Sequence, residues 1–376
     1  MTEAAVSLGT TALVLLFWSY VVYPALVAGL ARRAPPRSAV PNAPPAVDVL
    51  VSAFNEEASI GPRVANLLAQ DYSGRLGVLV GCDGCRDWTA VRARESGSER
   101  VHVAEFAERR GKAAVLNELV RRSRSEILVF TDANSAFDPD AISRVVAPFA
   151  DPQVGAVCGR LILEPSTGDR PTPETEFWDR ETRLKEAEGR LGVCLGANGA
   201  IYAARRPLVH PLPEATVLDD FLIPARIAGD GHRVVFAGEA VARERAASDV
   251  KAEVSRRFRI GVGAGRILLR EPWLLFVRRR PLVTLVYLSR KVARWLAPVL
   301  ACAAVAVGLF SPALRPYAIA AVAVLGLLAA SAAFPPRLPG WPGRLYYFGV
   351  INLALAAGVV AGLAGYRRPA WPRTAR

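Results

Sequence analysis

The chain has 376 residues, of which 52% are hydrophobic, and it carries a formal net charge of +13. Such an apolar composition is unusual for a soluble protein of this length, so membrane-spanning helices are the first feature to expect. The charge does not indicate nucleic-acid binding, because the basic residues cluster beside the apolar runs and in one late segment, without a recognisable nucleic-acid motif. A membrane surface and an anionic substrate are the partners that the charge predicts.

Four uncharged runs are long enough to cross a bilayer. The first covers residues 4–31, and the others are Trp295–Leu314, Pro316–Pro336 and Leu345–Tyr366. Each reaches the roughly 20 residues that a hydrocarbon core requires. Glu3 precedes the first run, and no Lys or Arg does, so this run is predicted to be a permanent anchor rather than a cleaved signal peptide.

Basic residues beside these runs predict their orientation. Arg32, Arg33 and Arg37 follow the first run, which places the next domain on the cytoplasmic side of a multi-pass protein of the cell (inner or plasma) membrane. Four crossings would return the C-terminus to the outside, yet Arg367 and Arg368 make that end basic as well. Either the first helix overrides the tail or one C-terminal span is re-entrant, and the sequence leaves both possibilities open.

The five cysteines are an odd number in a domain predicted to face the cytoplasm, which argues against a disulfide framework. Cys82 and Cys85 form a C-x-x-C pair. No second ligand pair at metal spacing is visible in the sequence, so zinc is not expected at this pair.

Short β-branched runs alternate with helical patterns after a Pro- and Arg-rich linker at residues 32–45. The predicted strands are Val47–Ala53, Leu76–Gly81, Val101–Ala104 and Ile127–Thr131, and the predicted helices are Glu56–Gln70, Asp87–Glu95 and Lys112–Arg124. This rhythm predicts an α/β domain at residues 46–248 with a mostly parallel sheet. Ligands bind at the carboxyl ends of such strands, and the polar clusters Asn55–Glu57, Asp83–Gly84 and Thr131–Asn134 lie there.

The stretch that follows has a different character. Between Asp249 and Pro281, arginines are mixed with Ile, Leu, Phe and Trp. This mixture predicts amphipathic helices on the cytoplasmic face of the bilayer, and we assign them residues 249–290. The predicted organisation is therefore a transmembrane helix at 4–31, the cytoplasmic domain, these interface helices, and three transmembrane helices at 295–366.

With these motifs, the sequence resembles the family 2 glycosyltransferases, in particular the membrane-bound branch related to hyaluronan, polyglucosamine and cellulose synthases. The resemblance runs from about Val47 to Gly263, with several motifs in the same order. It implies an α/β domain of the GT-A (Rossmann-like) type that binds a nucleotide-sugar and is flanked by transmembrane helices. It also implies an inverting hexosyltransferase whose donor we expect to be a UDP-sugar.

The resemblance assigns four residues to the nucleotide. Asn55 and Glu57 lie in a segment similar to the family's opening strand and turn. Asp83 lies in Cys82–Thr89, which resembles Asp-Gly-Ser-x-Asp-x-Thr, and would accept a hydrogen bond from the base. Lys112 follows a Gly in a loop similar to the family's Gly-Lys loop. The alternatives are a helix start, an Asp-Gly turn and a solvated helix end.

Thr131–Asn134 occupies the place of the family's Asp-x-Asp motif. By that match Asp132 and Asn134 would bind Mg²⁺ or Mn²⁺, and Asp132 would also meet the donor diphosphate, whose charge the cation neutralises. Asn replaces the second Asp of the motif, so lower metal affinity is expected. The alternative is an Asx turn that caps the next helix.

The acceptor side is implied by a glycine-rich segment. Gly196, Asn198 and Gly199 belong to a stretch that resembles the family's acceptor-lining segment, where glycine permits close approach of a sugar. A tight bend is the alternative.

Val217–Phe221 matches the family's acidic pair. By this match Asp220 is the catalytic base, which takes the proton of the attacking hydroxyl. Asp219 would raise the proton affinity of Asp220 if both were partly buried. An acidic pair at a helix start is the alternative.

The last motif departs from the family. Processive synthases carry Gln-x-x-Arg-Trp, whose Trp stacks on the acceptor sugar, whereas this chain keeps Arg259 but has Arg256 and Ile260 in place of Gln and Trp. Arg256 and Arg259 could meet the diphosphate or act as membrane-surface cations. Single addition to a lipid-linked or glycan acceptor is therefore expected. The alternatives are a processive synthase that translocates its product and a non-catalytic membrane scaffold.

Overall fold

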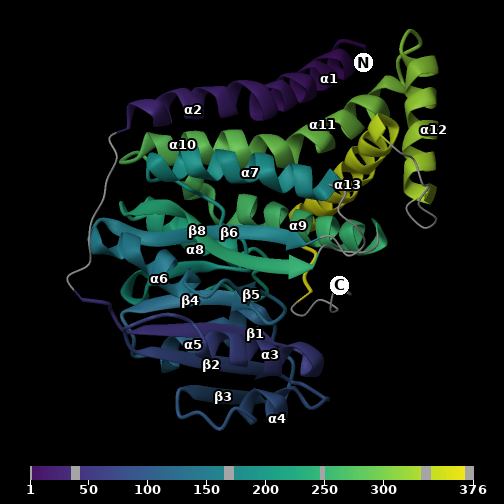
Figure 1. The fold of residues 1–376 in the computed structure, drawn as a ribbon. Helices are drawn as coiled ribbons and strands as arrows, with labels where there is room; N and C mark the ends of the chain where they lie inside the picture. The colour runs from purple at the N-terminus through teal and green to yellow at the C-terminus, as the bar shows by residue number, and fades with distance from the viewer. Residues whose placement is uncertain (1, 35–42, 165–172, 246–249, 332–339, 369–376) are drawn as a thin grey trace. The chain divides into compact units, whose positions relative to one another are not determined.

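The structure is a computed structural model that describes residues 2–34, 43–164, 173–245, 250–331 and 340–368. Its contacts divide the chain into two units. Figure 1 labels the helices and strands of the chain. The sheet unit comprises Val27–Ala246 and Arg368–Arg373, and the helical unit comprises Met1–Leu26, Ala247–Arg367 and Thr374–Arg376.

The sheet unit is built on an 8-stranded sheet in the order β3-β2-β1-β4-β7-β6-β8-β5. The strands are β1 (Val47–Ala53), β2 (Leu76–Asp83), β3 (Val101–Phe106), β4 (Ile127–Asp132), β5 (Ala136–Phe137), β6 (Val154–Glu164), β7 (Tyr202–Arg205) and β8 (Arg233–Arg245). The first four strands are parallel neighbours. β7 runs antiparallel to both β4 and β6, and β6 is parallel to β8. The predicted parallel sheet is thus confirmed for one half, and the complete sheet is mixed.

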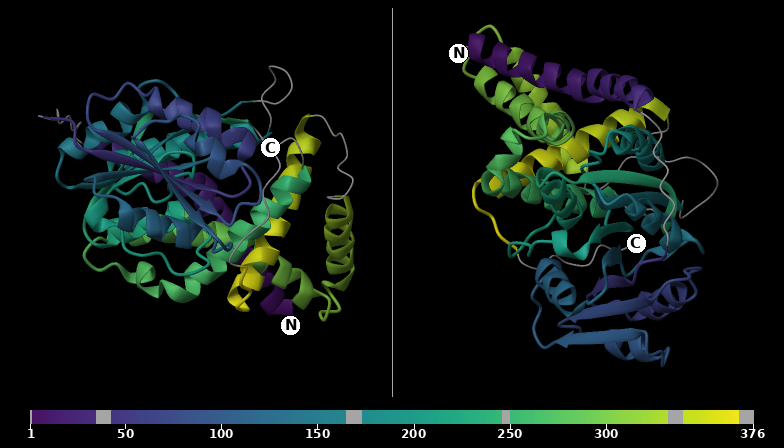
Figure 2. Two further views of the ribbon diagram at one scale, coloured as in Figure 1. Left: turned by 90° about the horizontal axis from the view of Figure 1, so that it is seen from below. Right: turned by 90° about the vertical axis from the view of Figure 1, so that its left-hand side faces the viewer.

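Helices cover both faces of this twisted sheet (Figure 2). They are α3 (Glu57–Leu68), α4 (Thr89–Arg94), α5 (Lys112–Arg122), α6 (Ala141–Val146), α7 (Pro173–Arg190) and α8 (Asp219–Gly229). On one face, Val49 and Val51 of β1 join a core with Ile60 and Leu67 of α3. Burial of each such side chain contributes about 1.5–3 kcal/mol. The core therefore fixes the strand ends that carry the polar clusters.

The helical unit contains most of the apolar helices. Residues 2–33 are continuously helical as α1 (Thr2–Phe17), η1 (Trp18–Val22) and α2 (Tyr23–Arg33), and α2 crosses the boundary between the units. The later elements are α9 (Val250–Arg270), η4 (Pro272–Phe276), α10 (Pro281–Val286), η5 (Tyr287–Val292), α11 (Ala293–Gly308), α12 (Arg315–Ser331) and α13 (Gly340–Leu363).

Three helices in the described residues are long and apolar enough to cross a membrane, namely Thr2–Arg33, Pro281–Gly308 and Tyr346–Leu363. The second begins at Pro281, earlier than the expected Trp295, so part of the segment assigned to the interface belongs to this apolar helix. The predicted run Pro316–Pro336 corresponds to α12, which has 17 residues and is shorter than the other three. Residues 332–336 of that run, and Arg37, lie outside the described residues.

The N-terminal helix is joined to the helix that begins at Pro281 by polar side chains. The indole of Trp18 donates a hydrogen bond to Ser289 Oγ at 2.9 Å. Arg294 Nε donates to Ser19 Oγ at 3.0 Å, and its guanidinium lies over the ring of Tyr20. The first two of these apolar helices therefore pack together within the helical unit.

Four glycines bring α9 and α13 into backbone contact. A Cβ on Gly261 would collide with the carbonyl oxygen of Leu355, and one on Gly358 would collide with that of Phe258. Gly265 and Gly362 pack in the same way against the opposite helix. This Gly-x-x-x-Gly spacing lets helices approach closely. One face of α9, predicted as a surface helix, is therefore buried against α13.

Candidate active site

The polar clusters expected at the strand ends lie on one edge of the sheet. Asp83 is the last residue of β2 and Asp132 is the last residue of β4, and β1 lies between these strands. Asn55 follows β1 by two residues. The predicted placement of these clusters at neighbouring carboxyl ends is therefore confirmed.

Asp83 holds the loop that leads into α5. Its carboxylate is buried, with Oδ1 accepting a hydrogen bond from the backbone N–H of Arg110 at 2.6 Å and Oδ2 accepting one from Gly111 at 2.9 Å. Gly84 has a φ of 64°, and a Cβ there would lie 2.7 Å from the backbone nitrogen of Arg109. This turn therefore requires glycine. Asp83 thus fixes the start of α5 in addition to its predicted contact with a base.

Asn55 and Glu57 connect the turn after β1 to the loop after β2. Asn55 has a positive φ of 53°, and its Oδ1 accepts a hydrogen bond from the backbone N–H of Arg86 at 2.9 Å. Glu57 Oε2 accepts one from the backbone N–H of Trp88 at 3.1 Å. These contacts shape the rim of the site, and the predicted contacts with a nucleotide stay predictions.

Lys112 is the cation at the centre of the site. Its Nζ donates a hydrogen bond to Asp132 Oδ1 at 2.9 Å and lies 3.4 Å from Asp219 Oδ2. Burial alone would lower the pKa of Lys112, but the carboxylates of Asp132 and Asp219 raise it above its usual value. The ammonium is therefore charged at neutral pH and joins the end of β4 to the start of α8.

Tyr202 supports Asp219 from inside the core. The hydroxyl of Tyr202 donates to Asp219 Oδ2 at 3.1 Å, and its ring stacks on that of Phe130 with centroids 4.6 Å apart. Burial and the negative charge of Asp219 raise the pKa of Tyr202, so it remains a protonated donor. Tyr202 was not among the residues predicted from the sequence, although it lies three residues after Gly199.

Arg63 is a second residue of the site that was not predicted from the sequence. It is 2% exposed on α3, donates to Thr131 Oγ1 at 2.7 Å and to Asn66 Oδ1 at 2.6 Å, and lies over the ring of Phe137. Desolvation lowers its pKa to about 9. Thr131 in turn donates to the carbonyl oxygen of Ala200 at 2.6 Å. A buried guanidinium therefore fixes the backbone that carries Asp132.

The residues expected to hold a cation are accessible. The side chain of Asp132 is 35% exposed, and Asn134 is exposed two residues later. No cluster of three or more His, Cys, Asp or Glu side chains able to hold a metal occurs in the described residues. The pair fits a hard cation through its carboxylate and amide oxygens, provided that the donor diphosphate supplies further ligands. The ammonium of Lys112 already contacts Asp132, so a cation would share this carboxylate with it.

The glycine-rich segment is closely connected to the same carboxylate. A Cβ on Gly199 would lie 2.7 Å from Asp132 Oδ2, so glycine is required for Asp132 to lie there. Asn198 is 4% exposed, and its side chain bonds the carbonyl oxygen of Gly159 and the backbone N–H of Ile201. Gly196 has a φ of 128°. These are the contacts of a tight bend, and the predicted acceptor contacts stay predictions.

The acidic pair begins α8. Asp219 is buried, whereas Asp220 is partly exposed. The carbonyl oxygen of Asp220 accepts a hydrogen bond from the backbone N–H of Ala197 at 3.1 Å. Its carboxylate lies close enough to Lys112 to contribute to the raised pKa of that ammonium. Asp220 is therefore the carboxylate of this pair that an acceptor hydroxyl could reach.

Arg256 and Arg259 lie on α9 in the helical unit. Arg256 and Arg257 form ion pairs with the buried carboxylate of Glu253, at 3.3 and 2.6 Å. Burial would raise the pKa of Glu253, but the two guanidinium groups lower it below its usual value. Both arginines lie outside the sheet unit, which carries the carboxylates, and their predicted contacts with a diphosphate stay predictions.

The C-x-x-C pair flanks Asp83. Cys82 is buried, Cys85 is partly exposed, and the Sγ of Cys85 lies 3.6 Å from the carbonyl oxygen of Ala53. A hydrogen bond between the two thiols lowers the pKa of Cys85 to about 7 and raises that of Cys82. Cys85 is therefore the more reactive thiol of the pair.

A GT-A-like α/β fold with carboxylates at neighbouring strand ends defines a class of nucleotide-sugar-binding domains. The family model described as glycosyltransferase like family 2 matches residues 44–263, which is more than half of the chain. The chain belongs to this family.

Curated relatives include two proteins named N-acetylglucosaminyltransferase. The protein from Azorhizobium caulinodans is 28% identical over 216 residues, which are 56% of this chain and 53% of the relative. The protein from Rhizobium meliloti is 31% identical over 183 residues, which are 47% of this chain and 42% of the relative. The chain thus spans about half the length of these relatives.

A solved structure shares the fold over nearly the whole chain. The mannosyltransferase PcManGT from Pyrobaculum calidifontis, in complex with GDP-Man and Mn²⁺, is 24% identical. The match covers 95% of this chain and 99% of PcManGT, with a TM-score of 0.67. At this identity the likeness shows the fold alone.

Proposed function

We propose that the protein is an inverting hexosyltransferase, which transfers a sugar from a nucleotide-sugar to a hydroxyl of its acceptor. The observation that carries this proposal is the cluster of Lys112 with Asp132 and Asp219, next to the accessible carboxylate of Asp220. A scaffold would gain little from an ammonium that joins two carboxylates at a strand end and a helix start. An inverting transferase needs a cation at the leaving diphosphate and a base on the opposite side of the anomeric carbon.

Each residue of the cluster has a distinct task in this proposal. Asp83 accepts a hydrogen bond from the nucleotide base while it holds the loop before α5. The ammonium of Lys112, which contacts Asp132, also contacts the donor diphosphate. It stabilises the negative charge that develops on the diphosphate as the bond to the sugar breaks. Asp220 takes the proton of the acceptor hydroxyl as that oxygen attacks the anomeric carbon. Asp219, held by Tyr202, keeps Lys112 in place.

Asp132 and Asn134 would hold Mg²⁺ or Mn²⁺ together with the donor diphosphate. The bound cation would neutralise the charge that develops on the leaving group. The oxygen ligands of this pair support a hard cation, and the fold relative PcManGT is described with Mn²⁺. The single carboxylate in the pair supports weak binding in the absence of donor, because the diphosphate must complete the ligand set.

The relatives suggest which donors to test first. Two of them are named for transfer of N-acetylglucosamine, and PcManGT is described with GDP-Man. We expect a UDP-sugar, with UDP-N-acetylglucosamine as the first candidate and GDP-mannose as the second. The membrane-bound synthase branch that the motifs resemble stays part of this proposal.

A membrane location is supported by the three helices that are long and apolar enough to span a bilayer. We place the sheet unit on the cytoplasmic side, where nucleotide-sugars are available, and expect a lipid-linked or glycan acceptor. Ile260 at the position of the family's Trp supports single addition over processive synthesis.

The experiment is release of nucleoside diphosphate by purified membranes that contain the full chain, across UDP- and GDP-sugars, with Mg²⁺, Mn²⁺ or EDTA. Labelled products are then sized on a gel. Release with one donor and a product extended by one sugar would support the proposal. A ladder of products would favour the processive alternative. No release with any donor, with lipid acceptors present, would favour the scaffold.

A further inference from the structure

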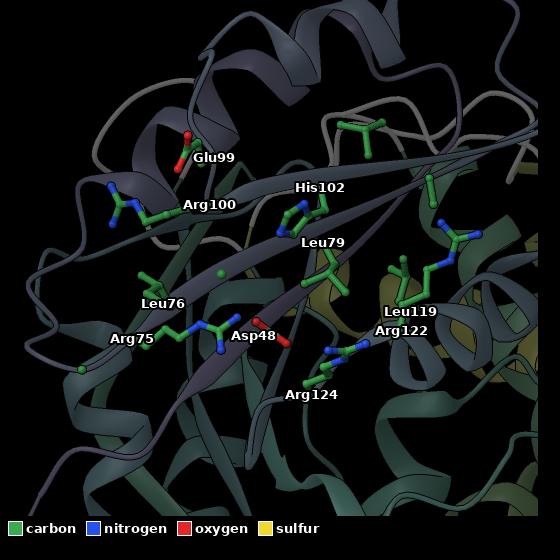
Figure 3. Close-up of a pocket in the computed structure, with 14 residues that line it drawn as sticks. Asp48, Arg75, Leu76, Leu79, Glu99, Arg100, His102, Leu119, Arg122 and Arg124 are labelled. Carbon is green, nitrogen blue, oxygen red and sulfur yellow. The ribbon is translucent and has the colours of Figure 1, made fainter.

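A cavity of about 660 Å³ opens near the start of β2, away from the carboxyl ends of the strands that carry the candidate active site. Figure 3 shows the residues that line it. It is lined by the first residues of β2, by β3, by Asp48 of β1 and by the C-terminal end of α5. Gly77 on its floor lies six residues before Asp83 along β2, which corresponds to about 20 Å of extended strand. The cavity is therefore separate from the site described above.

The cavity lies beyond the end of α5, on the face of β2 that carries Gly77 and Gly81. A Cβ on Gly81 would collide with Val115 of α5, so the helix packs closely on this part of the strand. Towards the start of β2 the helix has ended, and the face is open. Gly77 lies opposite Asp48 in the parallel register, and a Cβ there would collide with Asp48 Oδ1. Glycine at this position lets the carboxylate form the floor of the cavity.

The wall of the cavity is cationic. Four arginines from three parts of the chain line it, namely Arg75, Arg100, and Arg122 with Arg124, against the two acidic residues Asp48 and Glu99. Arg122 forms an ion pair with Glu118, and Arg100 donates to the carbonyl oxygen of Leu68. In the part of the chain that the structure describes, the guanidinium groups of Arg75 and Arg124 make no ion pair or hydrogen bond.

Helix stability alone does not explain these arginines. Basic residues in the last turn of a helix interact favourably with its dipole, which accounts for Arg121 and Arg122 on α5. Arg75 and Arg100 lie just before β2 and β3, and Arg124 follows α5. Their convergence on one opening is a property of the tertiary fold.

The floor adds a second type of recognition. Asp48 is 5% exposed, and its Oδ2 accepts a hydrogen bond from Ser123 Oγ at 2.6 Å. Its other oxygen lies over Gly77 on the cavity floor. Figure 3 shows this carboxylate between Arg75 and Arg124. A ligand here meets guanidinium groups at the rim and one hydrogen-bond acceptor on the floor.

We propose that this cavity binds a phosphate ester that carries hydroxyl groups. Guanidinium groups bind phosphate through paired hydrogen bonds, and the free oxygen of Asp48 accepts a hydrogen bond from a hydroxyl of the same molecule. The volume lies within the range of about 300–1,000 Å³ that is usual for small-molecule sites. A soluble sugar phosphate and a phosphatidylglycerol headgroup share this chemistry.

The test uses the full chain in detergent with EDTA and without any nucleotide-sugar, so it does not depend on transferase activity. Isothermal titration calorimetry measures binding of glucose 6-phosphate and of inorganic phosphate, and native mass spectrometry measures retention of phosphatidylglycerol against phosphatidylcholine. The variant combines Arg75→Ala with Arg124→Ala. Both side chains are exposed, so their removal should not affect folding. Arg121→Ala is the matched control, since Arg121 is an exposed neighbour that does not line the cavity.

Binding of glucose 6-phosphate, weakened roughly tenfold or more in the double variant and retained in Arg121→Ala, would support the soluble ligand. Selective retention of phosphatidylglycerol with the same dependence would support the headgroup. In the soluble case, glucose 6-phosphate should bind more tightly than inorganic phosphate, and Asp48→Asn should reduce this preference. The proposal would be overturned if glucose 6-phosphate does not bind and phosphatidylglycerol is not selectively retained. It would also be overturned if the double variant leaves such binding unchanged.

Discussion

The ammonium of Lys112 lies 2.9 Å from Asp132 Oδ1 and joins the first residue of α5 to the last residue of β4. Before a donor binds, the ammonium neutralises the negative charge of the Asp132 carboxylate at the end of the strand. On the proposed function, this same ammonium is available to the diphosphate. The pair therefore has a structural role in the sheet unit and a chemical role in the proposed transfer.

The first prediction concerns this cation. Replacing Lys112 with Met should lower kcat/KM for the donor by roughly 10²- to 10³-fold, because one preorganised cation is lost from the leaving-group side. Lys112→Arg should retain more activity, since it keeps the charge. Steady-state kinetics with the donor identified in the membrane assay measures both. Activity of Lys112→Met within a few-fold of the wild type would show that this cation does not act on the donor.

The second prediction concerns Arg63. Arg63→Met should lower the melting temperature of the protein, because hydrogen bonds from a charged group to Thr131 and Asn66 are lost, each contributing about 1.5–3 kcal/mol. It should also weaken donor binding, since the backbone that carries Asp132 loses its support. Arg92→Met, at an exposed position on α4, is the control. An unchanged melting temperature in Arg63→Met would contradict the supporting role.

The third prediction is a pH dependence. The hydrogen bond from Cys82 lowers the pKa of Cys85 to about 7, so the reactive thiolate should form as pH rises through about 7. Alkylation of Cys85 by iodoacetamide, followed by mass spectrometry, should accelerate over this range. Cys82→Ala should move the midpoint upwards, towards the ordinary value of about 8.5. A midpoint that is the same in both proteins would contradict the thiol–thiol interaction.

Local patterns were sufficient to predict the first half of the sheet unit. The apolar run Val47–Ala53 has the bounds expected from the sequence, and the following helices and strands differ from their expected bounds by only a few residues. Each of these elements is defined by a short continuous pattern that the neighbouring turn residues end. Asp83 and Asp132 could be placed for the same reason, because they lie within two residues of the ends of such runs.

The rest depended on contacts between distant residues. Tyr202 meets Asp219 only because β7 inserts beside β4 in the antiparallel direction. Arg63 looks like a solvent-exposed helix residue until α3 packs on the sheet and buries it beside Thr131. Similarly, the close packing of α9 against α13 could not be predicted from either Gly-x-x-x-Gly pair alone, because it requires the two pairs to face each other.

The most direct test of the central claim is the comparison of Asp220→Asn with Asp230→Asn at the other end of α8. Nucleoside diphosphate release and equilibrium donor binding are measured for both variants. If Asp220 is the base, its variant should bind the donor with near wild-type affinity and lose release by roughly 10²-fold or more, while the control keeps both. Release by Asp220→Asn within a few-fold of the wild type would contradict the assignment.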